Sequence, residues 1–155
     1  MASAVADRYE PSALVVGDDF FSFLHRGAIE PWLPAADPQN QAVLAAAAAA
    51  CSRLAERFTV VYDGVLWPPY AALFATEAAR TFHYALLLPP LDVCLDRVRE
   101  RSDHPFSDQA AATDMWQSFA SARGSLPIIE ALDAPDRVAD EIVRRVADGT
   151  IRTAR

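Results

Sequence analysis

Apolar runs of strand length alternate along this chain with longer stretches whose polar residues recur at helical spacing. Three runs are continuous rather than alternating, which is typical of strands covered on both faces; they are Ala13–Val16, Thr59–Tyr62 and Tyr84–Leu88. A weaker strand candidate is Leu126–Leu132. The stretches between them predict helices over Gln39–Arg57, Pro69–Ala79, Leu91–Arg101, Asp108–Ala122 and Pro135–Ala147. This succession of strands and helices predicts an α/β fold, a parallel sheet with flanking helices.

Length and composition narrow the class of protein. The 155 residues, slightly more than half of them apolar, predict a single domain over residues 1–155. The net charge of −7 argues against nucleic-acid partners, which are held by basic faces. No signal peptide is recognisable, and the alanine run Ala45–Ala50 is too short to span a bilayer. We therefore expect a cytoplasmic protein without a membrane partner, in which Cys51 and Cys94 are buried, reduced thiols. The oligomeric state stays open.

Acidic residues follow the first two predicted strands. Gly17-Asp18-Asp19 ends the first strand, and Asp63-Gly64 ends the second. Ligands of open parallel sheets bind beyond the carboxyl ends of the strands, so this pattern predicts a site for a metal, a phosphate or a reacting hydroxyl. Two alternatives stay open. In the first alternative, Asp19 only caps a helix that begins at Phe20. In the second, Asp63 and Gly64 only form a tight turn.

Two tryptophans lie in segments that follow these strands. Trp32 lies in the proline-broken loop Gly27–Gln41, and Trp67 opens the segment WPPY. Aromatic side chains on loops above a sheet often line a substrate pocket. Packing against the helices is the alternative for both.

Paired arginines follow the third predicted strand. Arg97 and Arg101 lie one helical turn apart, and the polar segment Ser102–Ser107 comes next. This pattern predicts a lid that closes on phosphates. A solvated helix face with ion pairs to Asp96 and Glu100 is the alternative.

Together these segments resemble small P-loop kinases. GDDFF, the loop GAIEPWLP followed by DPQNQ, VVYDGV with WPP behind it, and CLDRVRERSDHP carry the resemblance by their order. The similarity is to bacterial ATP-binding proteins of the AAA-33 and zeta-toxin-like type, relatives of chloramphenicol phosphotransferase, shikimate kinase and adenylylsulfate kinase. It covers Ala13 to about Ile142. It implies a P-loop NTPase fold of the nucleotide-kinase type, ATP and Mg²⁺ as cofactors, and a small-molecule hydroxyl as phosphate acceptor.

The resemblance also implies roles for the aspartates. Asp19 matches the acid that contacts the acceptor hydroxyl and takes its proton. Asp18 is its neighbour and positions magnesium or water, and Asp63 matches the acid near the metal. These are the positioning groups and counter-charges that phosphoryl transfer needs.

Further positions carry over from the same resemblance. Arg97 and Arg101 match the lid arginines that hold ATP phosphates and stabilise charge during transfer. Trp32 and Trp67 would border the acceptor pocket.

The first element of these kinases, a strand followed by GxxxxGK[ST] and a helix, has no counterpart here, because the chain contains no lysine. The segment ASAVADRYEP resembles the end of that helix, so we expect roughly 20 residues to be absent before it. In these kinases the absent strand lies between the strands that here carry Asp63 and Leu86. We therefore expect two inner strand edges without a partner, and weak ATP binding by the 155 residues alone.

Three functions are compatible with this sequence. The first is an ATP-dependent small-molecule kinase that needs the missing loop for activity. The second is a kinase-fold remnant or binding module without catalysis. The third is an unrelated Mg²⁺-dependent α/β phosphohydrolase that uses Asp18, Asp19 and Asp63 to activate water.

Overall fold

The computed structural model describes residues 1–78, 82–100, 108–121 and 127–151. Its strands are β1 (Ser12–Val16), β2 (Thr59–Asp63), β3 (Leu86–Leu87) and β4 (Ile128–Ile129). Its helices are α1 (Ala2–Ala6), α2 (Gly17–Phe21), α3 (Asp37–Leu54), α4 (Pro68–Ala78), α5 (Leu91–Glu100), α6 (Gln109–Ala120) and α7 (Pro135–Ala147), with a 3₁₀ turn, η1 (Pro34–Ala36), before α3. The predicted strands and helices all form, and β3 and β4 are shorter than expected.

The strands form two separate parallel pairs. β1 pairs with β2 from Ser12 opposite Thr59 to Val16 opposite Asp63. β3 pairs with β4, with Leu86 opposite Ile128. In the part of the chain that the structure describes, β2 and β3 are not hydrogen-bonded to each other. The predicted parallel sheet with flanking helices is thus present in part, as two small parallel sheets divided between β2 and β3. Within the described residues, β2 and β3 each have one strand partner only, which agrees with the expected unpaired edges.

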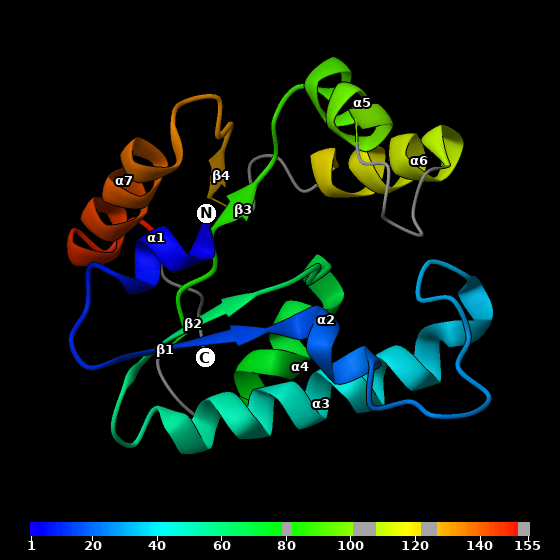
Figure 1. Ribbon diagram of the computed structural model, residues 1–155, viewed down its shortest axis with the longest axis horizontal. Coiled ribbons are helices and arrows are strands. Elements are labelled where there is room, and N and C mark those ends of the chain that lie inside the picture. Colours follow the sequence, from blue (N-terminus) through cyan, green and yellow to red (C-terminus); the bar gives the residue numbers. More distant parts are fainter. Residues whose placement is uncertain (79–81, 101–107, 122–126, 152–155) are drawn as a thin grey trace.

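One apolar core nevertheless joins the two pairs. It combines Val15 of β1 and Leu86 of β3 with α3 and α4. Phe74 of α4 is only 1% exposed, and its ring packs against Tyr62 of β2 with centroids 4.7 Å apart. A smaller apolar cluster packs α7 against β4 through Val138 and Ile129. Figure 1 shows α3 and α4 on one side of the β1–β2 pair, with α1 and α7 grouped together on the other side.

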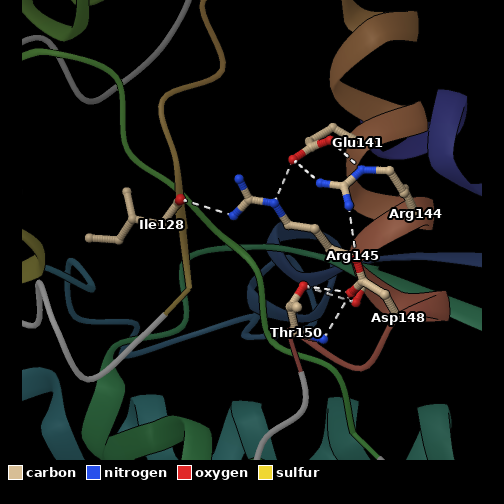
Figure 2. A network of polar contacts seen from close by, with 6 residues as sticks. All are labelled: Ile128, Glu141, Arg144, Arg145, Asp148 and Thr150. Carbon is tan, nitrogen blue, oxygen red and sulfur yellow. Dashed lines mark hydrogen bonds and ion pairs between the residues drawn. The ribbon is translucent and has the colours of Figure 1, made fainter.

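Ion pairs to Arg8 and a hydrogen bond to β4 hold α7 in place. Arg8, which follows α1, donates hydrogen bonds to Asp136 (3.1 Å) and Asp140 (3.0 Å) of α7. Within α7, Glu141 accepts hydrogen bonds from Arg144 (2.9 and 2.8 Å) and Arg145 (2.6 Å). Figure 2 shows Arg145 reaching across to the carbonyl oxygen of β4, its Nη1 3.5 Å from Ile128 O. The helix is thereby attached to both α1 and β4.

No helix in the described part of the chain is long and apolar enough to cross a bilayer.

Candidate functional site at the ends of β1 and β2

Two aspartates emerge directly where β1 turns into α2. Val16 is the last residue of β1 and also the N-cap of α2, without a side-chain cap hydrogen bond. Asp18 and Asp19 therefore lie in the first turn of α2, and both are exposed. The alternative that Asp19 caps a helix beginning at Phe20 is wrong, because α2 begins at Gly17. Acids in a first turn favour the helix by their interaction with its dipole and remain available to solvent.

The register of the first strand pair brings Asp63 to the same place. Asp63 ends β2 opposite Val16, and both Asp18 and Asp63 border one cavity. The side chain of Tyr62 lies between the two strand ends: a Cβ atom added at Gly64 would lie 2.9 Å from its hydroxyl oxygen. Burial, with the charges of Cys51, Asp18 and Asp63, raises the pKa of Tyr62 to about 12. Tyr62 is therefore a neutral hydrogen-bonding group beside two acids.

The acids provide two candidate ligands for a metal rather than a complete metal site. Among the described residues, no group of three or more His, Cys, Asp and Glu side chains is placed to hold a metal ion. Magnesium in phosphate-transfer sites is usually held by one or two carboxylates together with substrate phosphates. Asp18 and Asp63 fit that kind of site. For the nucleotide itself the fit is incomplete, because the 155 residues contain no lysine and no GxxxxGK[ST] loop.

Of the two arginines predicted to bind phosphates, the structure describes Arg97 but not Arg101. Arg97 is exposed on α5 and donates a hydrogen bond to the carbonyl oxygen of Ala131, 3.4 Å away. Asp96 pairs with Arg99, the next arginine along the helix. Arg101 and the predicted lid, Ser102–Ser107, lie outside the described residues. The phosphate-binding role of the two arginines stays a prediction.

The two tryptophans differ in their surroundings. Trp67 is half-buried, stacked on Tyr70 at 6.4 Å and edge-on to Phe119 of α6 at 6.4 Å, so it packs between α4 and α6. Tyr70 donates a short hydrogen bond to Asp37, which joins α4 to the start of α3. Trp32 is also half-buried. Neither tryptophan borders the cavity beside Asp18 and Asp63, and their contact with an acceptor stays a prediction.

The loop that carries Trp32 is fixed to α3. Gln39 accepts the Ile29 N–H (2.8 Å) and donates to the Ile29 carbonyl (2.7 Å). Asn40 donates to the Pro31 carbonyl (2.7 Å). The proline-broken loop thus has a defined position before any ligand binds.

A large cavity separates the two strand pairs. Its volume is about 1100 Å³, and it extends from Asp18 and Asp63 along β2 and β3 to α1 and α7. The two cysteines were expected to be buried, reduced thiols, and both are free thiols. Cys51 is buried at the cavity wall, where burial raises its pKa to about 11, and Cys94 is half-buried.

Sequence reasoning missed Tyr62 as a member of the site. The run TVVY predicts a strand, but the direction of the Tyr62 side chain depends on how β1 and β2 pair. Gly17 and Gly64 were the available signal, because glycines at both strand ends leave room for a ring between them.

Comparison with known proteins finds a similar fold but no similar sequence. No protein-family model and no curated protein matches this sequence. Among solved structures, the chain is similar to the tunicamycin resistance protein of Deinococcus radiodurans, with a TM-score of 0.67 and 16% sequence identity. The similarity covers 94% of this chain and 88% of that chain. At this identity the likeness concerns the fold alone. The chain thus has a mixed α/β fold with small parallel sheets, arranged as in that protein.

Proposed function

We propose that this protein is a phosphotransferase that moves a phosphoryl group from ATP to a hydroxyl of a small molecule. The observation that carries the proposal is the placement of Asp18 and Asp63 beside one cavity, at the ends of adjoining parallel strands. The fold likeness and the resemblance of the sequence motifs to P-loop kinases support it.

Each proposed residue has a chemical task. Asp19, exposed in the first turn of α2, would accept the proton of the acceptor hydroxyl. Asp18 and Asp63 would hold Mg²⁺ together with nucleotide phosphates. Arg97 and Arg101 would neutralise charge on the phosphates. Trp32 and Trp67 would border the acceptor.

The 155 residues do not supply everything that this reaction needs. Lysine and the glycine-rich loop cradle the phosphates of ATP in P-loop enzymes, and neither is present. A phosphotransferase built on these residues would therefore need a phosphate cradle from outside them. We expect the 155-residue chain alone to show no ATP-dependent transfer.

The test uses protein purified from its native host, incubated with γ-labelled ATP, Mg²⁺ and hydroxyl compounds. Tunicamycin is the first acceptor to try, because the similar structure is named for resistance to it. Asp19→Asn should lower the turnover by a factor of about 10² to 10⁴ and leave ATP binding nearly unchanged, since a base acts on the acceptor. Asp114→Asn, on the exposed face of α6, is the matched control and should change neither quantity. Loss of ATP binding without a specific loss of turnover would remove Asp19 from the role of base.

Two further measurements distinguish the other functions. The lack of lysine favours a binding module without catalysis as the second candidate. That candidate requires a full-length protein that neither binds ATP tightly nor transfers phosphate. Phosphate release from a phosphoester by the 155-residue chain with Mg²⁺ would instead identify a hydrolase.

A further inference from the structure

Phe23 is the most exposed large apolar side chain among the described residues, at 73%. It lies just past the end of α2, where the chain continues as a turn: each N–H from Ser22 to Leu24 donates to the carbonyl oxygen three residues earlier. The ring of Phe23 meets the ring of Phe20 edge-on, with centroids 5.6 Å apart. Phe20 in turn packs against the main apolar core. Phe23 therefore presents an apolar surface to solvent in a defined position.

The carboxylate of Asp19 lies one turn before Phe23. Residues four apart on a helical surface are neighbours, with about 5–6 Å between their Cβ atoms. Asp19 and Phe23 have this spacing, and both side chains are exposed. A molecule whose hydroxyl meets Asp19 can therefore cover Phe23 with a group that is only a few bonds away from that hydroxyl.

The loop that follows adds further exposed apolar side chains, those of Ile29 and Leu33. Figure 1 shows this loop leading from α2 to the start of α3. The side chain of Gln39 accepts the Ile29 N–H and donates to the Ile29 carbonyl oxygen, at 2.8 and 2.7 Å. A surface that is already ordered loses less conformational freedom when a ligand binds. The apolar surface after Asp19 is thus held in place before binding.

Charge restricts the kind of molecule that fits beside Phe23. Asp18 and Asp19 are exposed at the start of α2, and Asp63 ends the adjoining strand. Carboxylates repel an anion and favour a neutral or cationic ligand. Nucleotide phosphates bind such a site together with Mg²⁺, whereas an acceptor has no counter-ion of its own. An acceptor with a carboxylate or phosphate group is therefore disfavoured here.

We propose that the acceptor is an alcohol without negative charge that carries an apolar ring or chain, and that Phe23 binds this apolar group while Asp19 meets the hydroxyl. The inference rests on the proposed function for the role of Asp19, and it names the substrate class of that site. Single exposed apolar residues are common on protein surfaces. Two observations distinguish Phe23: the contact of its ring with Phe20 and its place one turn after Asp19.

Binding of small alcohols to the 155-residue chain, followed by NMR without ATP or Mg²⁺, tests the proposal. The probe is phenylpropanediol, a phenyl ring on a three-carbon diol. Propanediol lacks the ring, and phenyllactate replaces the terminal CH₂OH by a carboxylate. We expect phenylpropanediol to shift the resonances of Asp19 and Phe23, and to bind about fivefold or more tightly than either of the other two compounds.

Two variants locate the bound ring. Phe23→Ala should weaken the binding of phenylpropanediol about fivefold or more, because the ring loses its apolar contact. Phe58→Ala is the matched control: Phe58 is also exposed, but it borders the large cavity. It should bind phenylpropanediol like the unmodified chain. The proposal is overturned if Phe23→Ala binds as tightly as the unmodified chain, or if Phe58→Ala weakens binding as much. Equal binding of propanediol or of phenyllactate would overturn it as well.

The transfer assay with the native protein separates this proposal from the proposed function. There, Phe23→Ala should raise KM for phenylpropanediol and leave kcat unchanged, because it removes an interaction common to the ground state and the transition state. Binding at Phe23 without any transfer contradicts the phosphotransferase proposal alone. Transfer to tunicamycin, with no binding of phenylpropanediol at Phe23, overturns the proposed substrate class alone.

Discussion

Replacing Gly17 tests the packing that brings the two acidic strand ends together. In Gly17→Ala the new Cβ would collide with the hydroxyl oxygen of Tyr62. It would also lie 2.9 Å from Tyr62 Cζ and 3.2 Å from the Asp63 carbonyl oxygen. These separations are below the optimum of about 3.5 to 4.0 Å for carbon contacts. Tyr62 cannot move away freely, because its ring packs on Phe74, which is almost fully buried.

The free-energy change combines two opposing effects. Overpacking of a filled site costs about 1–3 kcal/mol. Alanine is favoured over glycine in a helix interior by about 0.5–1 kcal/mol, and by less at the first position, where Gly17 lies. The expected net loss of unfolding free energy is about 1–2 kcal/mol. For a chain of this length it lowers the Tm by about 2–8 °C.

The assay is thermal and urea unfolding of four proteins: the unmodified chain, Gly17→Ala, Tyr62→Phe and the double variant. Tyr62→Phe removes the oxygen with which the new Cβ collides. We therefore expect the double variant to be more stable than the sum of the single changes predicts, by at least about 0.5 kcal/mol. Strict additivity, or a Gly17→Ala protein as stable as the parent, would refute the packing of Tyr62 between the strand ends.

Two further predictions concern α7 and the core. Hydrogen bonds from Arg144 and Arg145 lower the pKa of Glu141 to about 2, from 4.5, so their stabilisation is present above pH 4.5 and is lost as the pH falls toward 2. Glu141→Gln should therefore lower the Tm at pH 7 and have a much smaller effect at pH 2; a pH-independent Tm difference would contradict this. Phe74→Ala should cost about 3–5 kcal/mol in urea unfolding, because Phe74 is 1% exposed. Phe23→Ala, at 73% exposure, is the control, and equal losses would refute the assignment of the core.

Much of the fold was predictable from local sequence. Helix α7 runs over the predicted range Pro135–Ala147, because a proline at its first position and its amphipathic pattern both fix it locally. Strand length was not predictable in this way. The run Tyr84–Leu88 predicts five strand residues, but only Leu86–Leu87 pairs. A strand needs partners, and among the described residues β3 has one on a single side.

The part of the site that follows from the order of strands along the chain was predictable. The contacts between residues far apart in the sequence were not. Asp18 and Asp63 follow successive strands, and parallel pairing brings them to one cavity. The contact of Arg97 with Ala131 joins residues that are 34 positions apart, on a segment where Ala131 has a φ of 50°. No local pattern near either residue predicts that contact.

We propose that these residues form the acceptor and metal side of a phosphotransferase, and we expect its phosphate cradle outside them. The intact mass of the protein purified from its native host tests this claim most directly. The account predicts a mass above the 16.9 kDa of the 155-residue chain, with roughly 20 additional residues that include a glycine-rich loop and a lysine. A mass of 16.9 kDa would contradict the account, because the phosphate cradle would then be absent from the protein.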